Sequence, residues 1–499
     1  MSPASLHSPH ADRHRSRSTR PRGSLLLLAA TLAVVAWGTF AFGAVYEWAY
    51  VPLALAATAV GALGLLRGDR PVFTVNRLLW VGIGGLAALA LLQQVPLPRP
   101  WLERLSPSTV RFLAAYDLGF AFNAGADTGA AVAAPRRPIS IAPDATRTGL
   151  LLLCALATFL AGLLRGLSRT TAGRLTRALV VIGCILAIAG IAQKALLGEV
   201  AYNGMKIYGF WTPESLLTSP FGPFVNKNHF GGWMLMVIPL ALGLAMDAFE
   251  REGAPRGGVD RWLVWLSSPG GGRVLMFGSA ALLMIVSLLM TRSRSAMACL
   301  ALMTLLAGVA VWRRTRSGRV AAGVAAGFGA LVMLGALYAG SDAAISRFVT
   351  ETNSAQLRIS IWTVSLDVLR GFPLFGSGLD SFGTATIFYQ KPGAAHFREA
   401  HNDYLQVLVE CGAVGGVLLL TAIAGVWMSA RHRFTADREP GSYWPRVGAI
   451  IGLVAIAVQS SIEFSLQLPG NAAVFVVVLA LALYLPATRQ SSTTVIDVR

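Results

Sequence analysis

The stretch REAHNDYLQVLVECGAVGG, residues 398–416, places titratable side chains at the start of a long apolar run. His401 can act as a base or as a hydrogen-bond donor near neutral pH. Asn402 and Asp403 follow it, where Asn and Asp commonly cap a helix. Glu410 lies two helical turns further on, and an acid there must be protonated, paired or exposed to water. We expect a functional histidine held by its two neighbours, with Glu410 in a structural pairing; an interfacial histidine without a role is the alternative.

Two other polar stretches adjoin apolar runs. VNKNHFGG supplies Asn226, Asn228 and His229. They form either an interfacial helix cap or a polar cradle for a sugar or phosphate at a helix N-terminus. TRSRSAM supplies Arg292 and Arg294 in a connection too short to leave the membrane surface. These arginines either extend toward lipid head groups or grip phosphate oxygens through bidentate contacts.

The polar segment before residue 404 holds further candidates: Arg358, Trp362 and Asp380. Trp362 either stacks on a sugar ring or anchors the segment at the membrane interface. The sequence has no HExxH, Walker A, GxSxG or DxD pattern, so it offers no evident set of metal ligands. We therefore expect neither a metal nor a cofactor.

The elements that position these residues must be membrane helices. The chain is 55% hydrophobic and only 13% charged, whereas a soluble globular chain is about 25% charged. Its net charge of +18 comes from basic residues scattered between apolar segments, which argues against a nucleic-acid partner. The four cysteines also lie within apolar segments and indicate neither a metal site nor a disulfide framework.

Apolar runs of about 20 residues are long enough to cross the hydrocarbon core of a bilayer. Such runs predict an all-α polytopic membrane protein with about twelve transmembrane helices. The predicted spans are residues 24–44, 47–66, 78–95, 148–165, 178–197, 229–248, 274–291, 295–312, 320–340, 404–429, 446–463 and 470–486.

Loop charges predict the orientation of these spans. With the basic tail 1–23 inside, the cytoplasmic side holds 26 of the 42 Lys and Arg and 9 of the 24 acids, a net charge of +17. The other side holds 16 and 15, a net charge of +1. This asymmetry agrees with the positive-inside rule. We therefore expect a membrane domain over residues 24–486, followed by a cytoplasmic tail over 487–499.

Three outer loops follow from this topology: 96–147, 198–228 and 341–403. The stretch FAFNAGADTGAAVAAP in the first loop has no clear periodicity, which predicts a flexible excursion. The third loop precedes the tenth span. Its apolar residues from Leu357 to Leu369 follow helical spacing, so this large loop should be partly helical and folded.

The sequence resembles the O-antigen ligase and polymerase superfamily of bacterial glycosyltransferases. The resemblance rests on FGPFVNKNHFGGWM, TRSRSAM, RISIWTVSLDVLRGFPLFGSGLDSFG and HNDYLQVLVECGAVGG, which occur in this order over residues 222–416. It implies a GT-C-like enzyme of the bacterial inner membrane with its active site on the periplasmic side. The donor would be an undecaprenyl-diphosphate-linked glycan, and the acceptor a lipid A core sugar or another glycan.

The same resemblance implies a metal-independent, inverting transfer. Arg358 and either Arg292 or Arg294 would hold the diphosphate, and His401 would serve the acceptor hydroxyl. Lipid A core ligation is our preferred reaction, and polymerisation of O-antigen or exopolysaccharide repeat units is the alternative. A flippase for lipid-linked oligosaccharides is a rival from another class, and a peptidoglycan polymerase is a second rival.

Overall fold

A computed structural model describes residues 21–68, 71, 75–125, 136–197, 206–213, 219–253, 258–315, 344–390, 396–436, 439 and 441–485, with isolated positions between 323 and 330. Seven helices in these ranges are long and apolar enough to cross a membrane. They are α2 (Glu47–Arg67), α7 (Pro143–Gly166), α8 (Arg169–Leu197), α9 (Lys227–Glu252), α11 (Pro269–Met290), α12 (Arg294–Thr315) and α16 (Asp403–Ala436).

Four further helices are apolar but shorter. They are α1 (Pro21–Phe40), α3 (Arg77–Leu92), α17 (Tyr443–Gln459) and α18 (Pro469–Leu483). Each of these eleven helices coincides with a predicted span, and the predicted span 320–340 lies almost wholly outside the described residues. The chain is therefore an all-α, multi-pass membrane protein, as the sequence predicts.

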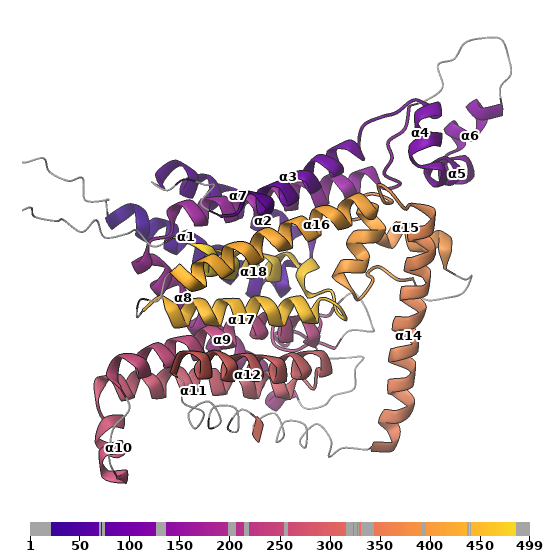
Figure 1. Cartoon of the computed structure of the whole chain (residues 1–499). Helices are drawn as coiled ribbons and strands as arrows, with labels where there is room; N and C mark the ends of the chain where they lie inside the picture. Colours follow the sequence, from indigo (N-terminus) through magenta and orange to yellow (C-terminus); the bar gives the residue numbers. More distant parts are fainter. Residues whose placement is uncertain are drawn as a thin grey trace, which may run out of the picture.

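The membrane helices run side by side, and α14 (Ala344–Gly371) crosses one end of the bundle (Figure 1). We call this end the α14 end. The opposite end is where α1 begins, and ion pairs join several helix termini there. Arg314 at the end of α12 pairs with Glu250 of α9, and Arg169 at the start of α8 pairs with Glu439. The two sets of connections that the sequence assigns to opposite sides of the membrane thus gather at opposite ends.

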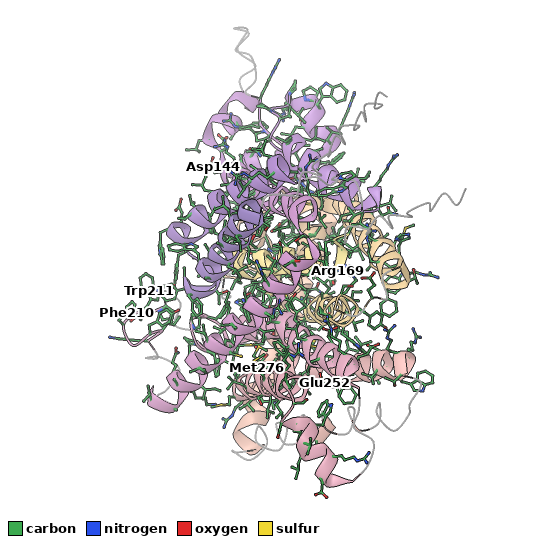
Figure 2. All side chains as sticks on the ribbon, turned by 90° about the vertical axis from the view of Figure 1, so that its left-hand side faces the viewer. Asp144, Arg169, Phe210, Trp211, Glu252 and Met276 are labelled. Carbon is green, nitrogen blue, oxygen red and sulfur yellow. The ribbon has the colours of Figure 1, made fainter. Side chains whose placement is uncertain are left out.

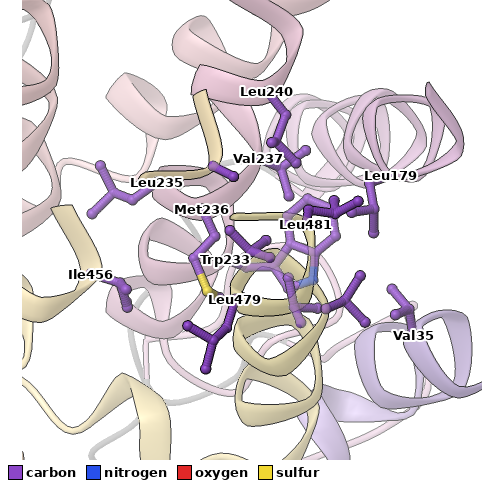
Figure 3. Packing of buried hydrophobic residues seen from close by; sticks show 14 of the residues in the cluster. Val35, Leu179, Trp233, Leu235, Met236, Val237, Leu240, Ile456, Leu479 and Leu481 are labelled. Atoms are coloured by element: carbon purple, nitrogen blue, oxygen red, sulfur yellow. The ribbon is translucent and has the colours of Figure 1, made fainter. Parts of the chain in front are cut away.

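Apolar packing around α9 and α18 forms the centre of the bundle. Trp233, Met236, Leu479 and Leu481 are almost completely buried there, and Figure 3 shows Trp233 enclosed by neighbouring helices. The Trp233 indole N–H donates to Thr39 Oγ1 at 3.0 Å, so its polar group is also satisfied. A helix that is apolar all round must be enclosed by other helices or by lipid, and α18 is enclosed on most sides by protein.

The predicted outer segments fold into short helices at the α14 end. α4 (Arg99–Leu105), α5 (Pro107–Tyr116) and α6 (Leu118–Gly125) precede α7, while α15 (Phe382–Tyr389) follows α14. The expectation of a flexible excursion from residue 120 was wrong for its first residues, because they end α6 and Phe120 packs in a small core with Leu102 and Ile139. The remainder of that stretch, residues 126–135, lies outside the described residues.

A second apolar core joins α14 and α15 to the start of α16. Its buried members include Ile361, Val368, Phe382 and Val409. The segment before the tenth predicted span is therefore folded and partly helical, as expected. It is attached to the membrane bundle by apolar packing as well as by the chain.

Helix α16 is broken at Gly412, whose φ is 63° and ψ is −166°. The segment 373–378 enters the break and exchanges four backbone hydrogen bonds with it. Ser377 and Gly378 donate to the carbonyls of Val409 and Glu410, while Ala413 and Val414 donate to those of Pro373 and Leu374. Irregular backbone inside a membrane protein must find such partners, because lipid offers none.

Candidate functional site

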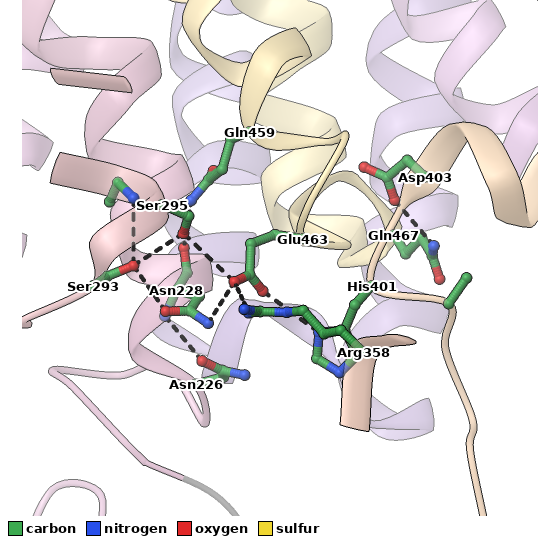
Figure 4. A network of polar contacts seen from close by, with 12 residues as sticks. Asn226, Asn228, Ser293, Ser295, Arg358, His401, Asp403, Gln459, Glu463 and Gln467 are labelled. Atoms are coloured by element: carbon green, nitrogen blue, oxygen red, sulfur yellow. Dashed lines mark hydrogen bonds and ion pairs between the residues drawn. The ribbon is translucent and has the colours of Figure 1, made fainter. Parts of the chain in front are cut away.

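A buried carboxylate joins five segments of the chain at the α14 end (Figure 4). Glu463 is only 1% exposed and lies between α17 and α18. Its Oε1 accepts from Arg358 Nη2 at 2.6 Å, from Asn228 Nδ2 at 2.9 Å and from Ser295 Oγ at 3.5 Å. Its Oε2 lies 3.6 Å from His401 Nδ1. Residues as far apart in the sequence as Asn228 and His401 thus share one acid.

The surroundings of Glu463 keep it charged. Burial would by itself raise the pKa of this carboxyl group, but the adjoining His401, the Arg358 guanidinium and His229 outweigh burial and lower the pKa. A nearby positive charge favours the ionised form of a carboxyl group. Arg358 and His401 therefore face a permanent negative charge near neutral pH.

The stretch VNKNHFGG contributes the side chain of Asn228 to this network. Asn226 caps α9 by accepting from the backbone N–H of Asn228 at 2.9 Å, so the capping interpretation is correct for Asn226. The Asn228 side chain instead enters the network, where its Oδ1 accepts from Ser293 Oγ at 2.8 Å. His229 is buried one residue further along, with its ring edge-on to Phe464. His401 also meets Phe464 edge-on, so this phenyl ring lies against both imidazoles.

The TRSRSAM stretch reaches Glu463 through its serines. Ser293 and Ser295 are buried and bond to Asn228 and Glu463, respectively. Arg292 is half-buried in the tight turn between α11 and α12, whereas Arg294 is exposed at the first position of α12. The structure therefore distinguishes the two arginines by environment, which the sequence could not do.

The start of α16 is held as the sequence led us to expect, but with a different partner for Asp403. Asn402 caps the helix, since its Oδ1 accepts from the backbone N–H of Leu405 at 3.0 Å. The Asp403 N–H donates to the carbonyl of Ser460, and its Oδ1 accepts from Gln467 Nε2 at 3.0 Å. Asp403 thus ties α16 to the connection that carries Glu463 rather than capping its own helix.

Three of the predicted site residues adopt left-handed backbone conformations. The φ angles are 54° for Arg292, 62° for Asp380 and 49° for His401. Such a conformation costs an L-residue roughly 1–2 kcal/mol. It persists where surrounding contacts enforce it, and such residues cluster at functional sites.

The remaining candidates support the site from outside the network. Trp362 packs against the second core, and its indole N–H donates to the carbonyl of Ala400 at 3.0 Å, so it anchors the segment before His401. Glu410 pairs with amides rather than with a cation. Its carboxylate accepts from the backbone N–H groups of Asp380 and Phe382 at 2.8 and 3.3 Å, at the start of α15. Burial raises the pKa of Asp380 to about 6.

Sequence reasoning missed Glu463. Its signal was the isolation of the residue: between Glu439 and Asp497 no other acid occurs. An ionisable residue in such apolar surroundings is a functional candidate. Among the described residues no three His, Cys, Asp or Glu side chains gather as a metal site would require; metal independence stays a prediction.

One family model matches a part of the chain that includes some of these residues. The family model described as O-antigen ligase matches residues 279–420. This part of the chain is thus similar to the O-antigen ligase and polymerase superfamily, the family that the sequence motifs indicate. The matched region contains Arg292, Arg358 and His401. No curated protein matches the chain. Ligase- or polymerase-type glycosyl transfer in a membrane, with a lipid-linked glycan as donor, is therefore the general activity of the family.

Proposed function

We propose that this protein transfers a glycan from undecaprenyl diphosphate to a sugar hydroxyl of the lipid A core at the periplasmic face of the inner membrane. One observation carries the proposal. Arg358, His401 and the polar groups of the α9 and α12 starts converge on Glu463 at the end of the bundle crossed by α14. This arrangement combines a phosphate-binding side chain with a base.

In the proposed reaction, the acceptor oxygen attacks the anomeric carbon while the bond from that carbon to the diphosphate oxygen breaks. The lipid diphosphate leaves with the bonding electron pair, and the configuration at the anomeric carbon is inverted. The proton of the acceptor hydroxyl passes to the imidazole of His401. Glu463 lies beside that imidazole and offsets the positive charge it gains.

The arginines stabilise the leaving group in this proposal. Negative charge grows on the diphosphate as the bond breaks, and preorganised guanidinium groups away from bulk water oppose that charge more strongly than solvated ones. The Arg358 side chain remains about 35% exposed although it pairs with Glu463, so part of it is accessible from outside the network. Arg292 is the second candidate, because it is half-buried in a left-handed turn.

Glycan analysis of a deletion strain tests the reaction. Long carrier-linked polymer together with bare lipid A core supports ligation. Single repeat units on the core would overturn ligation in favour of polymerisation. Lipid-linked glycan trapped on the cytoplasmic side would mean a flippase, although the charged network includes Arg358 of α14, the helix that crosses one end of the bundle.

The role of His401 has a direct test in detergent with purified protein and lipid-linked donor. His401→Ala should lower transfer by about 100-fold or more, because general acid–base help is typically worth about 10²–10⁴-fold. Donor binding should remain, since the arginines are unchanged. Near-normal transfer by His401→Ala would show that the histidine has no catalytic role and only forms part of the start of α16.

A further inference from the structure

The peptide groups before His401 are held from two helices at once. Ala400 is fully buried. Its N–H donates to Gln406 Oε1 of α16 at 2.9 Å, and its carbonyl accepts from Trp362 Nε1 of α14 at 3.0 Å. His401 follows immediately with φ of 49°. The backbone therefore enters the left-handed residue in an orientation that both neighbouring helices define.

The Gln406 amide is itself oriented by a buried acid. Gln406 Nε2 donates to Glu410 Oε1 at 3.0 Å, and both side chains are more than nine-tenths buried. Glu410 Oε1 accepts this bond, so it faces the NH₂ group of the glutamine. The amide oxygen then points toward Ala400. Because Glu410 also accepts from Asp380 and Phe382, the α15 start and the His401 backbone share one anchor.

We infer that Gln406, oriented by Glu410, and Trp362 are positioning residues that hold the His401 imidazole against Glu463. This inference rests on the proposed function of His401. A left-handed backbone is unfavourable for histidine, so without these two bonds the residue would relax toward ordinary backbone conformations. A side chain follows its backbone, and the imidazole would then leave its place 3.6 Å from Glu463.

A purely structural role is the competing explanation, and Gln93 provides the matched control. Gln93 at the end of α3 is fully buried. Its Nε2 donates to the carbonyls of Phe375 and Glu410, and its Oε1 accepts from Leu379. Gln93→Met and Gln406→Met each remove a buried amide beside Glu410. Only Gln406→Met releases Ala400.

The experiment measures steady-state transfer and thermal unfolding of the full-length protein, purified in detergent, for wild type and the variants Gln406→Met, Trp362→Phe and Gln93→Met. Gln406→Met should lower kcat by about tenfold or more with the donor KM within about threefold, because a misplacement near 1 Å can cost about 10²-fold. Trp362→Phe keeps an aromatic side chain, although a smaller one, but loses the N–H donor, and should lower kcat in the same way. Gln93→Met should lower the unfolding temperature with kcat per folded enzyme nearly unchanged.

A spectroscopic measurement gives a readout independent of turnover. In protein labelled with ¹⁵N-histidine, the His401 signal is assigned as the one lost in His401→Gln. That signal should move in Gln406→Met and stay in Gln93→Met. Unchanged kcat and an unchanged signal in Gln406→Met would overturn the inference while wild-type transfer still supports the proposed function. Equal loss of kcat in Gln406→Met and Gln93→Met would also overturn it. A wild-type protein without transfer activity would instead refute the proposed function.

Discussion

At the scale of single residues, the site depends on one acid shared by a base and a cation. Glu463→Gln keeps the size of the side chain but removes its charge, so Arg358 and His401 lose their common counter-ion. We expect transfer to fall by about 100-fold, within the range of general acid–base effects, and Glu463→Asp to restore part of it. Single-turnover transfer in detergent measures both. Wild-type rates in folded Glu463→Gln would show that the acid is dispensable.

The two arginines of the TRSRSAM turn should differ in function because they differ in environment. Arg292→Lys keeps the charge but loses the planar fork that grips phosphate. We expect it to slow donor use more than tenfold, roughly the 1.4 kcal/mol of one weakened charge-assisted contact. Arg294→Lys is the matched control and should remain near wild type, since Arg294 is exposed. Arg358→Lys should behave like Arg292→Lys.

Initial rates at several donor concentrations separate binding from turnover for these variants. Greater loss in Arg294→Lys than in Arg292→Lys would reverse the assignment. Normal rates in all three would remove the phosphate-binding role from these positions.

The sequence predicted Arg358, Asn228 and His401 as candidates because each is a polar residue at the boundary of an apolar run. Glu463 was not predicted because its role depends on contacts with residues that are distant in the sequence. Its contacts lie on α9, α12, α14 and the start of α16, and no local pattern around SSIEFSLQ contains those partners. Likewise, the sequence could not separate Arg292 from Arg294, since the turn between two helices sets which of them is half-buried.

At the scale of elements, hydropathy predicted the membrane helices well because burial in lipid requires long apolar runs. The break in α16 was not predicted. Gly412 lies within an apolar run, and a glycine there is compatible with an unbroken helix. The break depends on segment 373–378, which supplies partners for the opened backbone.

Gly412→Ala tests the break. A Cβ atom at this position would lie 2.3 Å from the carbonyl oxygen of Leu374, and φ is 63°. We expect a loss of at least about 1–3 kcal/mol of stability from the backbone conformation alone, together with loss of transfer. Gly416→Ala is the control in the same helix, because its Cβ would meet only the end of the flexible Leu408 side chain. Thermal unfolding in detergent compares the two, and an unaffected Gly412→Ala would contradict the role assigned to this backbone.

At the scale of the whole molecule, the charge asymmetry predicts that the α14 end faces the periplasm. Single cysteines in a background without the four natural ones test this. Arg370→Cys on α14 replaces a side chain that is 76% exposed and should react with an impermeant reagent once the outer membrane is permeabilised. Arg431→Cys, exposed near the other end of α16, should react only after the inner membrane is opened. The reverse pattern would invert the topology.

The broken helix also constrains how the protein is made. Segment 373–378 leaves the ribosome before α16, and the opened turn around Gly412 lies roughly 15 Å along that helix from its start at 1.5 Å per residue. If α16 entered the bilayer alone in its broken form, the unpaired N–H and carbonyl groups at the break would each cost several kcal/mol in lipid. Segment 373–378 must therefore be in place when the break in α16 forms, so biogenesis completes the two together. Chimeras between relatives should accordingly exchange residues 373–382 and 409–414 as one unit. Either segment alone would leave backbone N–H and carbonyl groups without their hydrogen-bond partners in the membrane.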